Sequence, residues 1–263
     1  MSINEKHAYG AKIAGFDPVG VAGFFRVARI SRCHGYVFAN VPKSGGTSAR
    51  DALKRAEAFV HGVQIGAADS SRPRDSTWFG RFSVDRNMMF WLPRAVSAGP
   101  VFTIVRNPFS RALSAYHEKV VKTFKMLDGE PGYTPEKLGQ RQNRIAQLGF
   151  GADDRPSFEE FLEAVAATPP SLIDQHFAPQ SYLTAVHTIP YDVIGRLENY
   201  HADMARISQI VFGDSTLWQR ALEATGGNLN VNYRGGGDAK RVRQEYSHRS
   251  VQLVKSYYAD DFD

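Results

Sequence analysis

The sequence contains one cysteine, Cys33, among its 263 residues. A single thiol excludes an internal disulfide and any metal site built from several cysteines, so a reducing compartment is expected. Because free cysteine is among the residue types most often buried, we expect Cys33 to act as a small apolar residue of the core.

The sequence also lacks a run of about 20 apolar residues, so no membrane-spanning helix is predicted. Its first ten residues, MSINEKHAYG, are polar where a secretory signal would be apolar. We therefore expect a cytoplasmic protein without stable membrane insertion. Residues 19–32 are apolar and basic, but Gly20 and Gly23 weaken them as an amphipathic helix. This stretch, part of a lead-in over residues 1–34, is expected to pack on the core.

There is no excess of acidic residues: Lys and Arg number 32, Asp and Glu 27, and the pI is about 9.3. This balance modestly favours anionic partners such as nucleotides or acidic glycans without selecting one of them. No internal repeat or low-complexity tract is present. A hydrophobic content of 43% is enough for a packed core, and a single domain over residues 1–263 is predicted.

The first informative segment begins with residues 35–41, GYVFANV. An almost continuous apolar run of this length is typical of a strand buried on both faces of a parallel sheet. Residues 47–59 follow as a predicted helix, because Ala49, Leu53 and Phe59 lie on one apolar stripe. Strand, glycine-containing loop and helix are therefore expected in that order.

A second segment repeats this plan. Residues 100–105, PVFTIV, indicate a buried strand, and residues 106–124 indicate a helix. Asn107 is its expected N-cap and Pro108 its first residue. Arg111 is expected on the surface of this helix.

The rest of the chain continues the alternation of helices and strands. A surface excursion with at most one helix is expected over residues 126–156, because Gly, Pro, Gln and charged residues predominate there. The other predicted elements are a helix at 157–165 with a Ser157–Glu160 capping box, a strand at 188–195, a helix at 199–213 ended by Gly213, and a helix from Ser247. The order predicts an α/β, P-loop-like three-layer fold in which helices flank a central, mostly parallel sheet.

The loop between the first strand and helix reads P-K-S-G-G-T-S. A loop that leaves a parallel strand and enters a helix exposes backbone N–H groups at the positive end of the helix dipole. Glycines let an anion approach that backbone closely, and the lysine adds a positive charge. The candidate anion-binding residues are Lys43, Ser44, Gly45, Gly46, Thr47 and Ser48.

This loop differs from the P-loop of nucleotide triphosphatases. In that motif, G-x-x-x-x-G-K-[ST], the lysine follows the last glycine and the hydroxyl residue holds Mg²⁺. Here Lys43 precedes the glycine pair, and no predicted strand ends in an acidic residue placed as a magnesium ligand. An Mg²⁺-dependent P-loop kinase is therefore the alternative that fits less well, and no metal is expected.

The order P-K-S-G-G-T-S resembles the 5′-phosphosulfate loop of sulfotransferases that use 3′-phosphoadenosine 5′-phosphosulfate (PAPS). In that family a strand ends in R-[ND]-P, with a serine eight residues after the arginine. Arg106 and Ser114 have this spacing in VRNPFSRALS. Three further stretches are similar to the carbohydrate (Golgi-like, family 2) branch, and with them the resemblance spans residues 35–262. They are DQHFAPQ (174–180), YDVIGRLENY (191–200) and YYADDF (257–262).

The resemblance implies a transferase that moves a sulfuryl group from PAPS to a hydroxyl of a carbohydrate or glycan-bearing acceptor. The product nucleotide would be 3′,5′-ADP, and no nucleic-acid partner is implied. Arg106 and Ser114 would bind the 3′-phosphate. Lys43 would pair with the oxygen that bridges phosphorus and sulfur, where negative charge grows as the bond breaks.

The general base has several candidates. His176 is the first, because an imidazole titrates near neutral pH, although a structural histidine is an equal alternative. His61 and Asp85 come next, whereas Glu57 is expected to be solvated. Some relatives carry a histidine pair upstream of the R-[ND]-P strand, and residues 78–93 contain no histidine. A non-catalytic nucleotide- or glycan-binding module on this scaffold therefore stays open.

Residues 226–241 form a glycine-rich, basic stretch that is expected to be a loop. If the loop closes over the nucleotide, Arg234, Lys240 or Arg241 would meet its phosphates. A solvated group of charges is the alternative.

Overall fold

The computed structural model describes residues 21–31, 33–62, 79–81, 96, 99–130, 134–224 and 235–262. The chain divides into two compact units. The first consists of residues 1–105 and 181–233, and the second of residues 106–180 and 234–263. The assignment of the whole chain to one domain stays a prediction.

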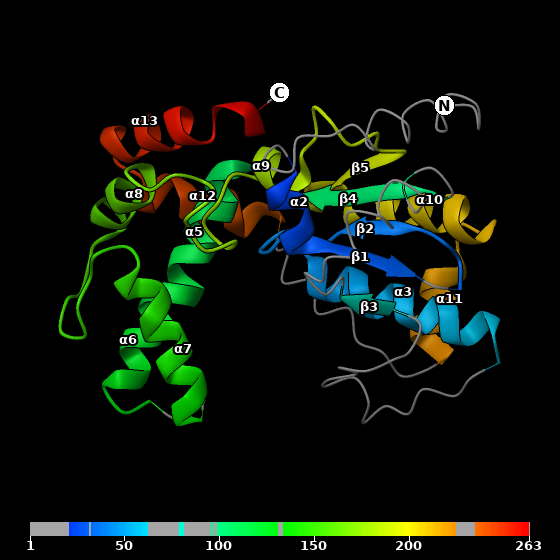
Figure 1. Cartoon of the computed structure of the whole chain (residues 1–263), viewed down its shortest axis with the longest axis horizontal. Coiled ribbons are helices and arrows are strands. Elements are labelled where there is room, and N and C mark those ends of the chain that lie inside the picture. The colour runs from blue at the N-terminus through cyan, green and yellow to red at the C-terminus, as the bar shows by residue number, and fades with distance from the viewer. Residues whose placement is uncertain are drawn as a thin grey trace. The chain divides into compact units, whose positions relative to one another are not determined.

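The first unit contains a five-stranded sheet with the order β3-β1-β2-β4-β5 (Figure 1). Its strands are β1 (Ala28–Ser31), β2 (Val37–Ala39), β3 (Phe79–Arg81), β4 (Val101–Val105) and β5 (Val193–Arg196). β2 pairs with β4 and β4 with β5 in parallel, whereas β1 is antiparallel to both of its neighbours. Since only β1 is reversed, the other four strands share one direction. The predicted mostly parallel sheet is confirmed.

Helices flank this sheet, as predicted. They are α2 (Ala22–Val27), α3 (Gly46–Val60), α10 (Tyr200–Phe212) and α11 (Leu217–Ala224), with the short α9 (Gln180–Thr184) and the 3-10 turn η3 (Leu197–Asn199). Side chains of α3, α10 and α11 form one buried cluster with β2, β4 and β5. In its centre the Phe38 and Phe102 rings stack at 5.2 Å, and Trp218 is fully buried.

Part of the expected lead-in forms β1, and Phe24 and Val27 of the lead-in are buried. Two predictions for this unit are wrong in detail. Cys33, in the turn after β1, is exposed rather than buried. The apolar stripe of α3 ends early, because Phe59 is 40% exposed and has the Arg220 guanidinium 5.6 Å from its ring centre. In both cases the residue type favoured burial, but the residue lies near or beyond the end of its element.

The second unit is built from helices. Its elements are α5 (Pro108–Tyr116), the π-helical turn η2 (His117–Val121), α6 (Lys122–Leu127), α7 (Pro135–Ala146), α8 (Phe158–Ala166), α12 (Gly235–Glu245), α13 (His248–Tyr257) and the 3-10 turn η4 (Ala259–Asp261). The predicted Ser157–Glu160 capping box is present, and Asn107 caps α5 by accepting from two main-chain N–H groups. Helix α7 is the one described helix within the predicted excursion, and α12 occupies part of the expected glycine-rich loop.

The helix predicted over residues 106–124 is interrupted by the π turn η2. The Arg141 guanidinium donates to the Glu118 carbonyl, and the Thr123 hydroxyl donates to the Lys119 carbonyl at 2.6 Å. Both carbonyls belong to the π turn, in which the regular main-chain hydrogen bonds of an α-helix are shifted by one residue. π turns of this kind often occur at functional sites.

Arg111 is also placed differently from its prediction. It is 1% exposed, and its guanidinium donates to the main-chain carbonyls of Ala178 at 2.9 Å and Gln175 at 3.3 Å. The residue type indicated a surface position, but partners 64 and 67 residues away in the sequence allow burial. Arg111 therefore ties α5 to the segment that contains DQHFAPQ.

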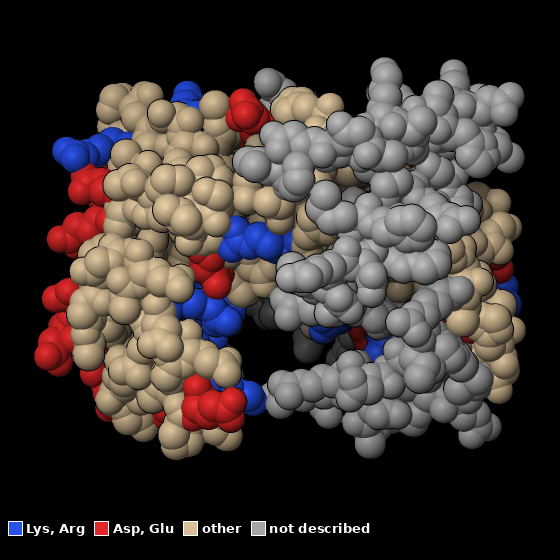
Figure 2. All heavy atoms as spheres, in the orientation of Figure 1, with Lys and Arg blue, Asp and Glu red and all other residues tan. Residues whose placement is uncertain are grey.

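None of the helices among the described residues is long and apolar enough to cross a membrane. On the face drawn in Figure 2, acidic side chains gather along the left margin and several basic side chains lie toward the middle of the view.

Candidate functional site

The glycine loop of the first unit occupies the predicted position between β2 and α3. Residues 42–45 form a turn, and Gly45 is the N-cap of α3 in the left-handed conformation, with φ of 76°. Gly45 has no side chain with which to cap the helix. The main-chain N–H groups of the first turn therefore point toward a place where an anion could accept from them. In this loop Ser44 is buried, Ser48 half-buried and Thr47 exposed.

Lys43 has an uncommon backbone conformation. Its φ of 70° lies in the left-handed region, which a residue with a Cβ atom adopts at a cost of about 1–2 kcal/mol. Its side chain is half-buried. Such strain persists where the surrounding structure imposes it, and it occurs often at ligand-binding sites.

Gly46 cannot carry a larger residue without a change in the loop. A Cβ atom there would lie 1.8 Å from Asn40 Oδ1 and 3.3 Å from the Val41 carbonyl oxygen. We expect Gly46→Ala to lower the free energy of unfolding by about 1–3 kcal/mol, because the added methyl group would clash with Asn40. Urea titration measures this effect.

The control for this variant is Gly139→Ala in α7, where a Cβ atom would meet nothing within 4 Å. That substitution should raise stability by about 0.5–1 kcal/mol, because alanine is the better helix former. If Gly46→Ala were as stable as the wild-type protein, the close packing of this loop would not constrain it.

The second motif follows β4. Arg106 is half-buried and comes directly after the strand, and Ser114 is half-buried on α5, about two helical turns beyond Asn107. β2 and β4 are neighbours in parallel register, so both motifs begin at the carboxyl ends of adjacent strands. The glycine loop belongs to the first unit, and Arg106 and Ser114 to the second.

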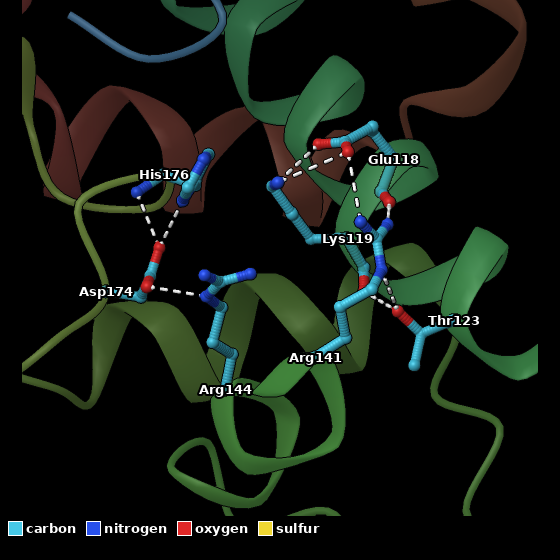
Figure 3. Close-up of polar contacts among 7 residues, drawn as sticks. All are labelled: Glu118, Lys119, Thr123, Arg141, Arg144, Asp174 and His176. Atoms are coloured by element: carbon cyan, nitrogen blue, oxygen red, sulfur yellow. Dashed lines mark hydrogen bonds and ion pairs between the residues drawn. The ribbon is translucent and has the colours of Figure 1, made fainter. Parts of the chain in front are cut away.

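His176, in the segment between α8 and α9, is held by Asp174. One carboxylate oxygen, Asp174 Oδ1, accepts from the His176 main-chain N–H at 2.9 Å and bonds the ring Nδ1 at 2.5 Å. The other oxygen, Asp174 Oδ2, pairs with Arg144 Nε at 3.0 Å. Figure 3 shows the carboxylate between the imidazole and the guanidinium. Since Asp174 bonds Nδ1, Nε2 is the nitrogen left to accept a proton.

The charges around this pair act in opposite directions. Burial lowers the pKa of His176 below its ordinary value, the positive charges of Lys119 and Arg144 lower it further, and Asp174 opposes them. Burial by itself would raise the pKa of Asp174, but its bonds to His176 and the charge of Arg144 hold it well below its usual range. A neutral imidazole beside an ionised carboxylate is therefore favoured at neutral pH.

A second polar group in this unit fixes the neighbouring π turn. Glu118 pairs with Lys119 at 2.9 Å and with Arg141 at 3.2 Å, and Arg141 also donates to the Thr123 hydroxyl at 3.0 Å (Figure 3). Lys119 is 11% and Arg141 7% exposed, so these charges are largely removed from water. These contacts fix the position of Lys119, whose positive charge lowers the pKa of His176.

The chain is similar to known proteins over most of its length. Residues 27–263 match the Sulfotransferase family. The chain belongs to the sulfotransferase family. Carbohydrate sulfotransferase 14 of Mus musculus and of Homo sapiens are each 29% identical to it over 113 residues. The matched part is 42% of this chain and 28% of the length of those relatives. No solved structure matches the chain.

Two of the other candidate bases of this sulfotransferase, Glu57 and His61, lie near the end of α3. Helix α3 has 15 residues and is therefore roughly 22 Å long, with the glycine loop at its start and His61 at its end. Glu57 lies one turn before His61 and is buried, not solvated as predicted. Burial raises its pKa, opposed by hydrogen bonds from Ser31 and Tyr36. Asp85 lies outside the described residues. Both Glu57 and His61 therefore lie at the opposite end of α3 from the glycine loop.

The basic C-terminal stretch of the sulfotransferase is described only in part. Arg234 lies outside the described residues. Lys240 and Arg241 are exposed on α12, and Arg241 pairs with Glu245 at 3.8 Å. The closure of this stretch over a nucleotide stays a prediction.

Sequence reasoning did not assign roles to Asp174 or Arg144. A signal for Asp174 was present, since an acidic residue two positions before a histidine can accept from both its main-chain and ring nitrogens. Arg144 carries no such signal, because it comes from α7, thirty positions before Asp174 in the chain.

Proposed function

We propose that this sulfotransferase moves a sulfuryl group from PAPS to a hydroxyl of a carbohydrate or glycan-bearing acceptor. One observation carries the proposal. A glycine loop with a strained lysine follows β2, and an Arg-Asn-Pro turn into a capped helix follows β4, its parallel neighbour. This pair of loops supplies separate groups for the two ends of a doubly anionic nucleotide.

In this proposal the loop at residues 42–48 binds the 5′-phosphosulfate. The main-chain N–H groups at the start of α3 and the hydroxyls of Ser44, Thr47 and Ser48 would supply hydrogen bonds. Lys43 neutralises the charge that develops on the bridging oxygen, so no metal is needed for that task.

Arg106 and Ser114 would bind the 3′-phosphate. A guanidinium presents two parallel donors to a phosphate, and a serine hydroxyl adds a third. This contact would distinguish PAPS and 3′,5′-ADP from adenine nucleotides without a 3′-phosphate.

His176 is proposed as the general base. The acceptor oxygen bonds to sulfur while the bond between sulfur and the bridging oxygen breaks, and the acceptor proton passes to His176 Nε2. The products are a sulfate ester and 3′,5′-ADP, and the imidazolium returns its proton to solvent. Asp174 would stabilise the imidazolium and maintain the orientation of the ring.

A carbohydrate acceptor is supported by the similarity to carbohydrate sulfotransferase 14 and by the three further stretches of the carbohydrate branch. The decisive experiment is a transfer assay with labelled PAPS against sugars, lipid-linked glycans and small phenols, read by mass. Transfer to a sugar hydroxyl is the expected result. Nucleotide binding without transfer to any acceptor would favour the non-catalytic module, and Mg²⁺-stimulated ATP binding would favour the kinase.

Arg106→Ala should weaken 3′,5′-ADP binding by about 100-fold, because it removes a charge-assisted contact with the 3′-phosphate. Calorimetry without added metal measures this loss. The control is Arg206→Ala, since Arg206 is exposed on α10. Equal affinities for Arg106→Ala and wild type would exclude Arg106 from the nucleotide site.

A further inference from the structure

The main chain of Arg106 is bonded by a buried side chain. Gln180 Oε1 accepts from the Arg106 N–H at 2.8 Å, and Gln180 Nε2 donates to the Arg106 carbonyl oxygen at 2.8 Å. Gln180 is 3% exposed. A side-chain amide that bonds both groups of one residue replaces the pair of bonds that a neighbouring strand would provide. Gln180 thus fixes the backbone at the point where the chain leaves β4.

Gln180 is itself held by Asp261 from the 3-10 turn η4. Asp261 Oδ2 accepts from the Gln180 main-chain N–H at 2.8 Å and lies 3.5 Å from Gln180 Nε2. Because this oxygen attracts the amide nitrogen, it orients the amide so that the Gln180 oxygen faces the Arg106 N–H. The segment before Gln180 is held as well, since the Tyr258 hydroxyl donates to the Phe177 carbonyl at 2.8 Å.

The negative charge of Asp261 is balanced inside the same unit. Burial lowers the pKa of the fully buried Arg111, and the charge of Asp261 opposes this effect. Asp261 therefore lies close enough to the buried Arg111 guanidinium to interact with its charge, and it accepts from the Gln180 N–H. The stretches 174–180 and 257–262 thus meet at Gln180, which bonds the main chain of Arg106.

We propose that Gln180, held by Asp261, is a positioning residue that aims Arg106 at the 3′-phosphate and thereby makes the protein select 3′-phosphorylated adenine nucleotides. This inference rests on the proposed function, in which Arg106 binds that phosphate. The direction of a side chain follows from its backbone dihedral angles, and a site must hold its groups within about 0.5 Å of the productive geometry. Two bonds to one residue's main chain supply that constraint.

The test compares the dissociation constants of 3′,5′-ADP and 5′-AMP, measured by calorimetry. The 5′-AMP molecule lacks the group that Arg106 would bind. In Gln180→Ala the preference for 3′,5′-ADP over 5′-AMP should fall at least tenfold, with the 5′-AMP affinity unchanged. Gln180→Glu should also reduce the preference for 3′,5′-ADP. Its carboxylate can accept from the Arg106 N–H, but it cannot donate to the Arg106 carbonyl oxygen.

The matched control is Gln175→Ala. Gln175 lies in the same segment and uses only its main-chain carbonyl, which accepts from Arg111, so both affinities should stay at wild-type values. Asp261→Asn retains the size of the side chain and should lower the preference less than Gln180→Ala. If Gln180→Ala does not fold, as judged by circular dichroism, Gln180→Glu and Asp261→Asn decide the question.

Equal losses of affinity for both nucleotides, or an unchanged preference in the folded variants, would overturn the positioning role. Failure of the proposed function gives a different result. In that case the wild-type protein itself would show no preference for 3′,5′-ADP over 5′-AMP.

Discussion

Replacement of Lys43 by alanine should lower kcat for sulfuryl transfer about 10³-fold and change the dissociation constant of 3′,5′-ADP less than tenfold. The bridging oxygen acquires most of its charge only as the bond to sulfur breaks, so the ammonium stabilises the transition state more than the bound nucleotide. Single-turnover rates with PAPS and calorimetry with 3′,5′-ADP separate the two effects. Lys255→Ala, at an exposed position of α13, is the control.

The backbone of Lys43 provides a second readout. Lys43→Gly should be as inactive as Lys43→Ala but more stable than it by about 1 kcal/mol, because glycine adopts a φ of 70° without steric cost. Urea titrations of the two variants measure this difference. Wild-type turnover in Lys43→Ala would exclude the catalytic role of the ammonium, and equal stability of the two variants would exclude strain at this position.

Replacement of His176 by alanine should lower kcat about 10²–10⁴-fold, as expected for loss of a general base. Asp174→Asn should cause a loss of similar size, because an amide can donate to Nδ1 and so favour the tautomer with its proton on Nε2. The dissociation constant of 3′,5′-ADP should not change in either variant. Asp153→Asn, at an exposed position before α8, is the control.

The pH dependence distinguishes a base from a structural histidine. His176 accepts a proton only when neutral, so kcat/KM should rise with pH through the pKa of His176, which burial, Lys119 and Arg144 lower. Asp174 raises this pKa, so the residual activity of Asp174→Asn should have its acidic limb at lower pH. Arg144→Gln removes a positive charge that lowers the pKa of His176, so the acidic limb of its kcat/KM profile should move to higher pH. A profile that does not move in either variant would exclude His176 as the base.

Much of the fold could be predicted because the signals are local. A period of about 3.6 residues placed α3, and short polar side chains placed the starts of α5 and α8, at Asn107 and Ser157. The apolar runs that became β2 and β4 are typical of buried parallel strands. β1 was missed because it continues directly from α2 within one apolar and basic stretch.

Burial was the weakest part of the prediction, since it depends on partners distant in sequence. Glu57 and Arg111 have charged side chains but are buried, because Tyr36 and Ser31 in one case and the carbonyls of Gln175 and Ala178 in the other bond them. Cys33 is apolar in character but exposed. Composition assigns an average environment to a residue type, and these residues depart from the average.

The order of residues in two short loops was sufficient to indicate the family, because the residues of each motif lie close together in the chain. The nucleotide and the residues proposed to bind it stay predictions. Only the tertiary structure determined which side chains position His176 and Arg106. Asp174 and Arg144 reach His176, and Gln180 and Asp261 reach Arg106, through hydrogen bonds and ion pairs. Such bonds require atoms within about 3 Å. Three of these four contacts join segments at least 30 residues apart, so no local pattern records them.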